Sequence, residues 1–201
     1  MVLVIQSKEM FFDFLEKYGR ESFNAPVVIQ PGVDCENLFL GCTSFNQPVS
    51  IPAGTKNISR MFKGCSSFNS PVQIPVGVEK AVETFAGCAS FNQPVSLEGN
   101  NCDCTRMFRQ CVNFNQSVKL TGVVNCQNLM ECCTSFNSYL SLGEGVKDAS
   151  LILTGCSKYN QKLTLPSSVV ECQNALEGTS SKEIGLNITQ GNMSLSQTNY
   201  F

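Results

Sequence analysis

The 201-residue sequence contains no histidine, and this absence bears on two kinds of chemistry. Imidazole is the usual base that activates a serine or cysteine nucleophile, and it is a common zinc ligand. No Cys-x-x-Cys pair compensates, because only Cys102-x-Cys104 and Cys132-Cys133 lie close together. Recurring acidic pairs and glycine-rich phosphate motifs are missing as well. We therefore expect a protein that is not an enzyme and that uses no metal and no cofactor.

Charged residues are also scarce, at 15% of the chain against roughly 25% in an average soluble protein. The surface is therefore expected to consist largely of Ser, Thr, Asn and Gln. Fourteen basic residues are scattered among sixteen acidic ones, and the net charge is −2. Nucleic-acid binding requires clustered Lys and Arg, so no nucleic-acid partner is expected.

Long apolar runs are the third absence. No stretch reaches 18 apolar residues, so membrane insertion is not expected. The apolar segment Met1–Ile5 is too short for a secretory signal, because charged residues begin at Lys8. We expect synthesis in, and retention by, a reducing cytoplasm, with release by cell lysis as an open alternative. In that compartment the twelve cysteines are expected to remain reduced and to serve as small hydrophobic side chains.

What the sequence does contain is one unit that recurs at intervals of 22 or 23 residues. A fixed period of this length is typical of a solenoid whose coils stack on one another. Each unit carries a Phe-Asn pair, replaced once by Tyr-Asn. The aromatic members of these pairs are Phe23, Phe45, Phe68, Phe91, Phe114, Phe136 and Tyr159.

Each aromatic residue is followed, four and six positions later, by two apolar residues. This period of two predicts a short strand with two inward side chains, and stacked coils place such strands in a parallel sheet. An eighth strand is expected at Leu186 and Ile188, where Lys182-Glu183 replaces the Phe-Asn pair. The seven regular pairs are Val27 and Ile29, Val49 and Ile51, Val72 and Ile74, Val95 and Leu97, Val118 and Leu120, Leu140 and Leu142, and Leu163 and Leu165.

A second pattern follows each strand. Ile58, Met61, Phe62 and Cys65 lie at i, i+3, i+4 and i+7, and equivalent residues recur in the next two repeats. This apolar stripe predicts about two turns of helix. Crossovers between parallel strands are nearly always right-handed. The predicted fold class is an α/β solenoid, a right-handed array of about seven to eight 22–23-residue coils with strands on one face and short helices on the other.

The array is expected to have a cap at each end. In residues 1–22, Ser7 as N-cap and Gly19 as stop signal predict a capping helix, with a partner-docking helix as the alternative. Residues 23–181 form the repeat solenoid. Residues 182–201 are expected to supply the last strand and a C-terminal cap, with a binding tail as the alternative for the polar end.

Asparagine and cysteine form regular columns. The Asn that follows each aromatic residue predicts a buried ladder that satisfies turn backbone in its own and the next coil. Asn115-Gln116-Ser117 also matches the glycosylation pattern, but Asn115 is expected to be buried. A cysteine stands three residues before most of the aromatic residues and is expected to fill the core. Disulfides between neighbouring coils are the alternative, because same-column Cα atoms come within roughly 5 Å.

Between the two inward residues of each strand, one side chain points outward. Solenoids commonly bind partners on such an extended face. This column is small, polar and nearly uncharged, which is equally expected of a solvated surface with no partner. The candidate binding residues are Ser50, Gln73, Ser96, Lys119, Ser141 and Thr164.

The unit Phe-Asn-Gln-Pro-Val-x-Ile-Pro-x-Gly-(x)n-Met-Phe-x-Gly-Cys-x-Ser is best preserved from Phe45 to Ser67. It resembles the BspA-like leucine-rich repeats, especially the subgroup with a Met-Phe pair and a Phe-Asn-Gln mark, over about residues 23–181. The sequence departs from leucine-rich repeats in using Val and Ile in place of Leu, and it loses the Met-Phe pair after Phe108. The resemblance implies a surface adhesion or protein-interaction module of bacteria or protists, and similar arrays occur in bacteriophage proteins.

Two functions follow as hypotheses. The first is a structural or decorating component of a larger assembly, such as a phage virion, that contacts a protein partner or copies of itself. The second is an adhesin or host-receptor recognition module. An adhesin needs export or attachment, and the sequence shows no signal or anchor, so we expect the first. The location would then be the virion if the chain is phage-encoded.

Overall fold

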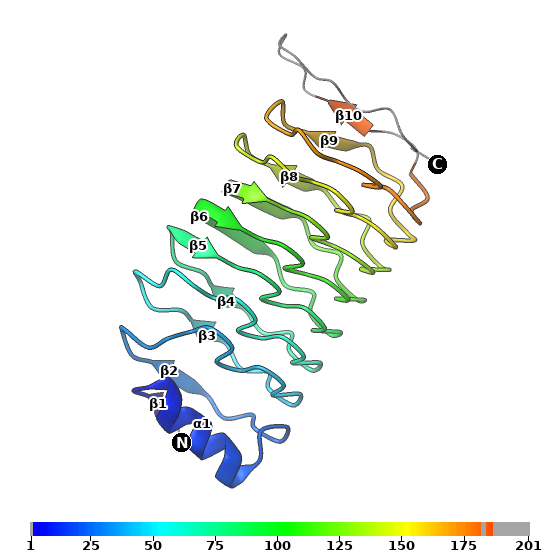
Figure 1. Cartoon of the computed structure of the whole chain (residues 1–201). Coiled ribbons are helices and arrows are strands. Elements are labelled where there is room, and N and C mark those ends of the chain that lie inside the picture. The colour runs from blue at the N-terminus through cyan, green and yellow to red at the C-terminus, as the bar shows by residue number, and fades with distance from the viewer. Residues whose placement is uncertain (1, 182–183, 187–201) are drawn as a thin grey trace.

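The computed structural model describes residues 2–181 and 184–186, which form a stack of similar coils (Figure 1). Equivalent strands of successive coils pair in parallel: Val49 lies opposite Val72, and Val118 lies opposite Leu140. The predicted parallel solenoid with a repeat of about 23 residues is confirmed. The elements are β1 (Leu3–Ile5), α1 (Lys8–Tyr18), β2 (Val27–Ile29), β3 (Val49–Ser50), β4 (Val72–Gln73), β5 (Val78–Lys80), β6 (Val95–Asp103), β7 (Val118–Asn125), β8 (Leu140–Leu142), β9 (Leu163–Leu165) and β10 (Ile184–Leu186).

Two columns of aromatic rings form the centre of the core. Phe45 stacks on Phe68 with ring centroids 5.8 Å apart and planes 3° apart, and Phe39 stacks on Phe62 at 5.5 Å and 5°. Each coil places its rings above those of the coil before, so the stacking continues through the array. The column that contains Phe45 extends to Tyr159, and all these rings are buried. The recurring aromatic positions read from the sequence are therefore core positions.

The predicted short helices do not form, and this part of the fold prediction was wrong. Residues 58–65 make a succession of turns, because Arg60 and Gly64 adopt positive φ angles of 56° and 76° and interrupt any helical run. The N–H groups of Ile58, Arg60 and Phe62 donate to carbonyl groups of the next coil at 2.8–2.9 Å, instead of to the residue four positions back. The apolar stripe is real, but turns present it, so the architecture is a parallel β-solenoid.

A second ladder runs along the coils and was not predicted. Strand β5 pairs with the end of β6, and the end of β6 pairs with the end of β7. Single bridges extend the same line at both sides, from Asn57 to Lys80 and from Asn125 through Asp148 to Glu171. Hydrogen bonds therefore link neighbouring coils on two sides of the stack.

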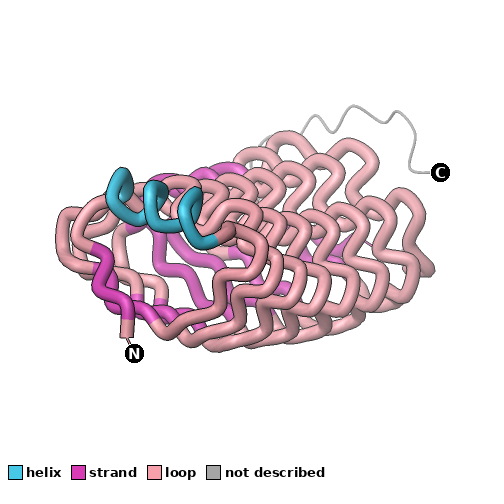
Figure 2. The backbone as a smooth tube through the Cα atoms, turned by 90° about the horizontal axis from the view of Figure 1, so that it is seen from below, coloured by secondary structure: helices cyan, strands magenta, loops and turns pink. Residues whose placement is uncertain are grey.

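The N-terminal helix is confirmed as α1. The Ser7 hydroxyl accepts a hydrogen bond from the Met10 N–H at 3.2 Å, and the N–H of Gly19 closes the last turn on the Leu15 carbonyl at 2.9 Å. The helix lies across the end of the stack (Figure 2), where the ring of Phe11 packs edge-on against those of Phe23 and Phe39. Strand β1, which precedes the helix and pairs with β2, was not expected.

At the other end, β10 differs from the prediction in register. Ile184 pairs with Leu163 and Leu186 with Leu165, whereas the repeat predicted Leu186 and Ile188 at these places. The last coil is thus two residues shorter than the pattern implied. Ile188 and the expected C-terminal cap lie outside the described residues. The number of coils and the division at residues 22 and 181 stay predictions.

Candidate functional site on the strand face

The six candidate binding residues lie on one surface, which we call the strand face. It is formed by the outward side chains of β3, β4 and β6 to β9. Ser50 lies opposite Gln73 on the neighbouring strand. Ser96 lies opposite Lys119, and Lys119 lies opposite Ser141 on the strand after it. Thr164 lies opposite Gly185 at the end of the array. Ser50, Gln73, Ser96, Lys119 and Thr164 are exposed, as the sequence predicted, whereas Ser141 is half-buried.

Most polar groups on the strand face are unused by the fold. The Ser50 hydroxyl donates to Oε1 of Gln73 at 3.3 Å. Among the described residues, no side-chain hydrogen bond or ion pair involves Ser96, Lys119, Ser141 or Thr164. The face therefore offers the hydroxyl groups of Ser96, Ser141 and Thr164 and the ammonium group of Lys119, none of which has a side-chain partner in the part of the chain that the structure describes.

Two exposed apolar groups border the strand face and were not assigned to a site from the sequence: Tyr139, which directly precedes β8, and Val28 of β2. Tyr139 is 69% exposed and occupies the position where the first four repeats have proline and the fifth has Ser117. Val28 is 46% exposed and lies in the outward column. The sequence contained both signals, because Tyr139 is the one aromatic residue in its column and Val28 is the one apolar residue in a column that is otherwise polar. Exposed aromatic side chains such as Tyr139 are enriched in protein-binding surfaces.

The asparagine column is a structural ladder, as predicted. The N–H of Asn69 donates to Oδ1 of Asn46 at 2.8 Å, and the N–H of Asn92 donates to Oδ1 of Asn69 at 2.8 Å. A Gln or Ser side chain of the next coil donates to most of the same Oδ1 atoms, as Gln93 does to Asn69 at 3.3 Å. The expected burial is wrong, however, because most of the column, including Asn115, is exposed. The ladder runs along the surface.

The cysteines have a structural role. Within the described residues no disulfide joins any of the twelve, and Cys132 is the one that is not buried. Five thiol groups donate hydrogen bonds to carbonyl oxygens of the preceding coil at 2.9–3.0 Å, as Cys88 does to Phe62; the five are Cys65, Cys88, Cys111, Cys133 and Cys156. Burial raises the pKa of Cys42 to about 11 and that of Cys156 to about 12, which disfavours the thiolate. These thiols are suited to packing and not to nucleophilic chemistry.

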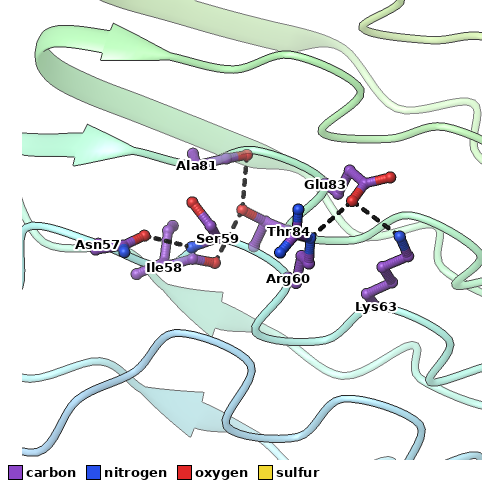
Figure 3. A network of polar contacts seen from close by, with 8 residues as sticks. All are labelled: Asn57, Ile58, Ser59, Arg60, Lys63, Ala81, Glu83 and Thr84. Carbon is purple, nitrogen blue, oxygen red and sulfur yellow. Dashed lines mark hydrogen bonds and ion pairs between the residues drawn. The ribbon is translucent and has the colours of Figure 1, made fainter.

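Charged side chains form a separate network on the turn side of the coils (Figure 3). Glu83 accepts hydrogen bonds from Arg60 at 2.9 Å and from Lys63 at 2.8 Å, both of which belong to the preceding coil. Burial alone would raise the pKa of the Glu83 carboxyl group, but these two hydrogen bonds and the two positive charges outweigh it and lower the pKa. Beside this network, the buried Thr84 hydroxyl hydrogen-bonds to the carbonyl groups of Ala81 and Ile58. The network joins successive coils and leaves no unpaired charge among its members.

A shallow hollow lies along the second ladder. Its volume is about 670 Å³, and it forms where β6 has two more residues than the paired segment of β5 and where its register with β7 is irregular. Asn101, in the bulge, has a positive φ of 49°. None of the six candidate residues lines this hollow. Its lining consists of Glu79, Lys80, Val82, Asn100, Asn101 and Asp103.

Two negative findings concern the described residues alone. In residues 2–181 and 184–186, no three His, Cys, Asp or Glu side chains are grouped so that they could hold a metal ion. Within the same ranges, no helix has the length and apolar character needed to cross a bilayer.

A protein-family model matches most of the chain in four overlapping segments. The family is described as "Mycoplasma protein of unknown function, DUF285", and the matched residues are 7–95, 34–143, 77–165 and 100–184. The overlaps are expected for a repeat array, because a model of a few coils can be placed at several positions along it. No curated protein matches the chain, and no solved structure matches it either.

Proposed function

The chain belongs to the DUF285 family, and from this premise we propose that it is a non-enzymatic interaction protein. The strand face binds a protein partner, and the chain serves as a structural or decorating component of a larger assembly. The observation that carries this proposal is the row of Ser96, Lys119, Ser141 and Thr164, whose side chains make no hydrogen bond or ion pair within the described residues.

The rigidity of the surface supports the same proposal. Two ladders, a stacked aromatic core and the asparagine ladder hold each coil against the next. The outward side chains therefore keep a fixed spacing in the unbound protein. Binding then costs little backbone conformational entropy. A preorganised, extended surface of this kind is the usual binding surface of solenoid proteins.

We also propose that the repeats are of the BspA-like type, on the strength of the Phe-Asn-Gln and Met-Phe marks. Two kinds of assembly fit this proposal and differ in where the partner is found. As a phage virion component, the chain co-purifies with particles. As an adhesin, it binds intact host cells and is absent from particles.

A charge reversal on the strand face tests the proposed function. In the virion case, Lys119→Glu places a negative charge at the centre of the face and is expected to abolish incorporation into particles. Lys147→Glu is the matched control, because Lys147 is also exposed and its side chain makes no ion pair within the described part of the chain, but it lies off the strand face. If both variants fold and are incorporated equally well, the strand face does not bind the partner.

A further inference from the structure

Two lysines and a tyrosine are exposed together toward the C-terminal end of the strand face. Lys119 belongs to β7, and Tyr139 and Lys162 directly precede β8 and β9. All three side chains are exposed, and each stands beside a buried residue of its strand. Because side chains alternate between the two sides of a strand, all three point away from the core on the same side of the sheet. We call these three residues the Lys-Tyr-Lys patch.

The patch spans three successive coils. The N–H of Val118, the residue before Lys119, donates to the carbonyl group of Tyr139 at 3.0 Å. Tyr139 and Lys162 each stand three residues after a ring of the stacked aromatic column, and these two rings are centred 5.8 Å apart. The two residues therefore occupy equivalent positions in neighbouring coils. Since parallel strands lie roughly 4.8 Å apart, Lys119 and Lys162 are about 10 Å apart along the stack, with Tyr139 between them.

The fold does not neutralise the two lysines. Among the described residues there are five ion pairs, and none involves Lys119 or Lys162. Two acidic residues lie on the neighbouring surface. Glu98 is on β6, one strand before Lys119, and Glu144 follows β8 and accepts a hydrogen bond from Ser167 at 3.2 Å. Neither makes an ion pair with the patch within the described part of the chain, so both ammonium groups are available to a partner.

Tyr139 is held in position in the unbound protein. Its carbonyl group accepts the bond from Val118, and the hydroxyl group of the preceding Ser138 donates to the carbonyl group of Asn115 at 2.7 Å. These contacts fix the backbone from which the ring projects, and the side chain is 69% exposed. A ring with a fixed backbone loses little conformational freedom on binding and buries a large area. Tyrosine is also one of the residues that dominate the binding energy of protein interfaces.

We propose that the Lys-Tyr-Lys patch binds an acidic, extended segment of a protein partner. The ring of Tyr139 packs against the middle of the segment, and one carboxylate on each side pairs with Lys119 or with Lys162. Carboxylates four residues apart lie on the same side of an extended chain at a spacing of about 13 Å, which flexible lysine side chains can reach. This inference rests on the proposed function, because it names the chemistry of the partner that the strand face binds.

The spacing of the charges favours an acidic peptide over a nucleic acid. A nucleic-acid strand carries one phosphate about every 3.4 Å, and proteins bind it with clustered basic residues. The patch instead offers two ammonium groups about 10 Å apart. Between them lie the ring of Tyr139 and the hydroxyl group of Ser141, which has no side-chain partner among the described residues. A chain with widely spaced carboxylates and with apolar and hydrogen-bonding groups between them matches this pattern.

The test is the binding of a labelled synthetic peptide, measured by fluorescence anisotropy. The peptide carries two glutamates four residues apart and a leucine midway between them. The wild-type protein is expected to bind it about five- to tenfold more tightly than the matched peptide with two glutamines, because two exposed ion pairs are lost in the second. Raising the salt concentration from about 50 to about 500 mM should remove most of this difference.

Variants locate the binding site. Lys119→Gln and Lys162→Gln should each weaken binding of the glutamate peptide about two- to fivefold, and Tyr139→Ala should weaken it at least about tenfold. Lys147→Gln is the control, because Lys147 is exposed but lies off the strand face, and it should bind like the wild type. All four side chains are exposed, so each variant should keep the melting temperature of the wild type.

Four results would overturn the proposal: equal binding of the two peptides, no binding at millimolar concentration, unchanged binding by a folded Lys162→Gln variant, or tighter binding of single-stranded DNA of the same length. Failure here is distinct from failure of the proposed function. If the acidic peptide does not bind but Lys119→Glu still abolishes incorporation into particles, the acidic partner is excluded and the proposed function stands. If the peptide binds as expected but Lys119→Glu is incorporated normally, the patch is supported and the role in the particle is excluded.

Discussion

The backbone N–H of Asn92 lies 2.8 Å from Oδ1 of Asn69, one coil earlier, and the same contact recurs along the array. The side-chain oxygen of each Asn thus accepts a hydrogen bond from a backbone N–H of the following coil. Gln93 Nε2 also donates to Oδ1 of Asn69, at 3.3 Å. Because the ladder is exposed, water competes for each of these groups, and its contribution per coil is modest.

Replacement of Asn69 measures this contribution. Asn69→Ala removes the acceptor for Asn92 and Gln93 and should lower the free energy of unfolding by about 0.5–1.5 kcal/mol. Asn69→Asp keeps an acceptor at the same place and should lose clearly less. Urea denaturation followed by circular dichroism gives both values. Equal losses for the two variants would show that the Oδ1 bonds are not the source of the stabilisation.

Removal of a stacked ring is expected to cost far more. Phe68→Ala leaves a cavity between Phe45 and Phe91, whose centroids lie 5.8 and 5.7 Å from that of Phe68. The loss should be about 3–5 kcal/mol, as for other large-to-small core changes. Ser96→Ala on the strand face should change the stability by less than about 0.5 kcal/mol. The same denaturation experiment compares them, and similar small losses would mean that the aromatic column is not a packed core.

Glu83 should make stability depend on pH in one direction. Its pKa in the folded protein lies below the ordinary value, so it stabilises the fold above the pKa of the unfolded chain, and this stabilisation is lost as the pH falls through the folded-state pKa. The difference in the free energy of unfolding between the wild type and Glu83→Gln should therefore be largest near pH 7 and become smaller as the pH falls. Denaturation at a series of pH values checks it.

The matched control for Glu83 is Glu98→Gln. Glu98 is exposed, and its carboxylate makes no ion pair within the described residues. Because this carboxylate has no partner to lose, Glu98→Gln should change the free energy of unfolding by less than about 0.5 kcal/mol at pH 7. A gap for Glu83→Gln that is constant with pH would assign the stabilisation to packing instead of to the ion pairs with Arg60 and Lys63.

Thiol reactivity should separate Cys132 from the other cysteines. Cys132 is half-buried, whereas the remaining eleven are buried. A thiol reagent added to the native protein should modify one site first, and a Cys132→Ser variant should lack this phase. Under denaturing conditions without reductant, all twelve thiols should react. A count well below twelve would show that disulfides form in solution.

Most of the candidate site was predictable from particular residues. Ser50, Gln73 and Lys119 were assigned outward places because each stands between two apolar residues two positions apart, and strand geometry leaves one direction for the middle residue. Val28 was expected to point outward but was not assigned to the site, and Tyr139 was not recognised as an exposed group. An isolated apolar residue at an outward position has no period of its own, so the pattern does not distinguish it from an error in alignment.

The sequence by itself determined the pitch and the columns. Repeats of 22 or 23 residues bury the same side chains in every coil, so Phe45, Phe68 and Phe91 had to stack once the coils were parallel. Tertiary structure alone decided whether the segments between the strands form helices or turns. The spacing of Ile58, Met61 and Phe62 suits a helix and a series of turns equally well, and the choice depends on bonds to the next coil.

Those bonds explain what remained hidden. The N–H of Arg60 reaches the carbonyl of Val82 at 2.8 Å, and this contact is available only when the next coil is in place. The second ladder also forms only between stacked coils. Likewise, β1 pairs with β2, from which it is separated in the sequence by α1 and the turn that follows. The repeat period shows which side chains occupy equivalent positions in successive coils. Hydrogen bonds between successive coils, which select turns over helices, form only in the stacked structure.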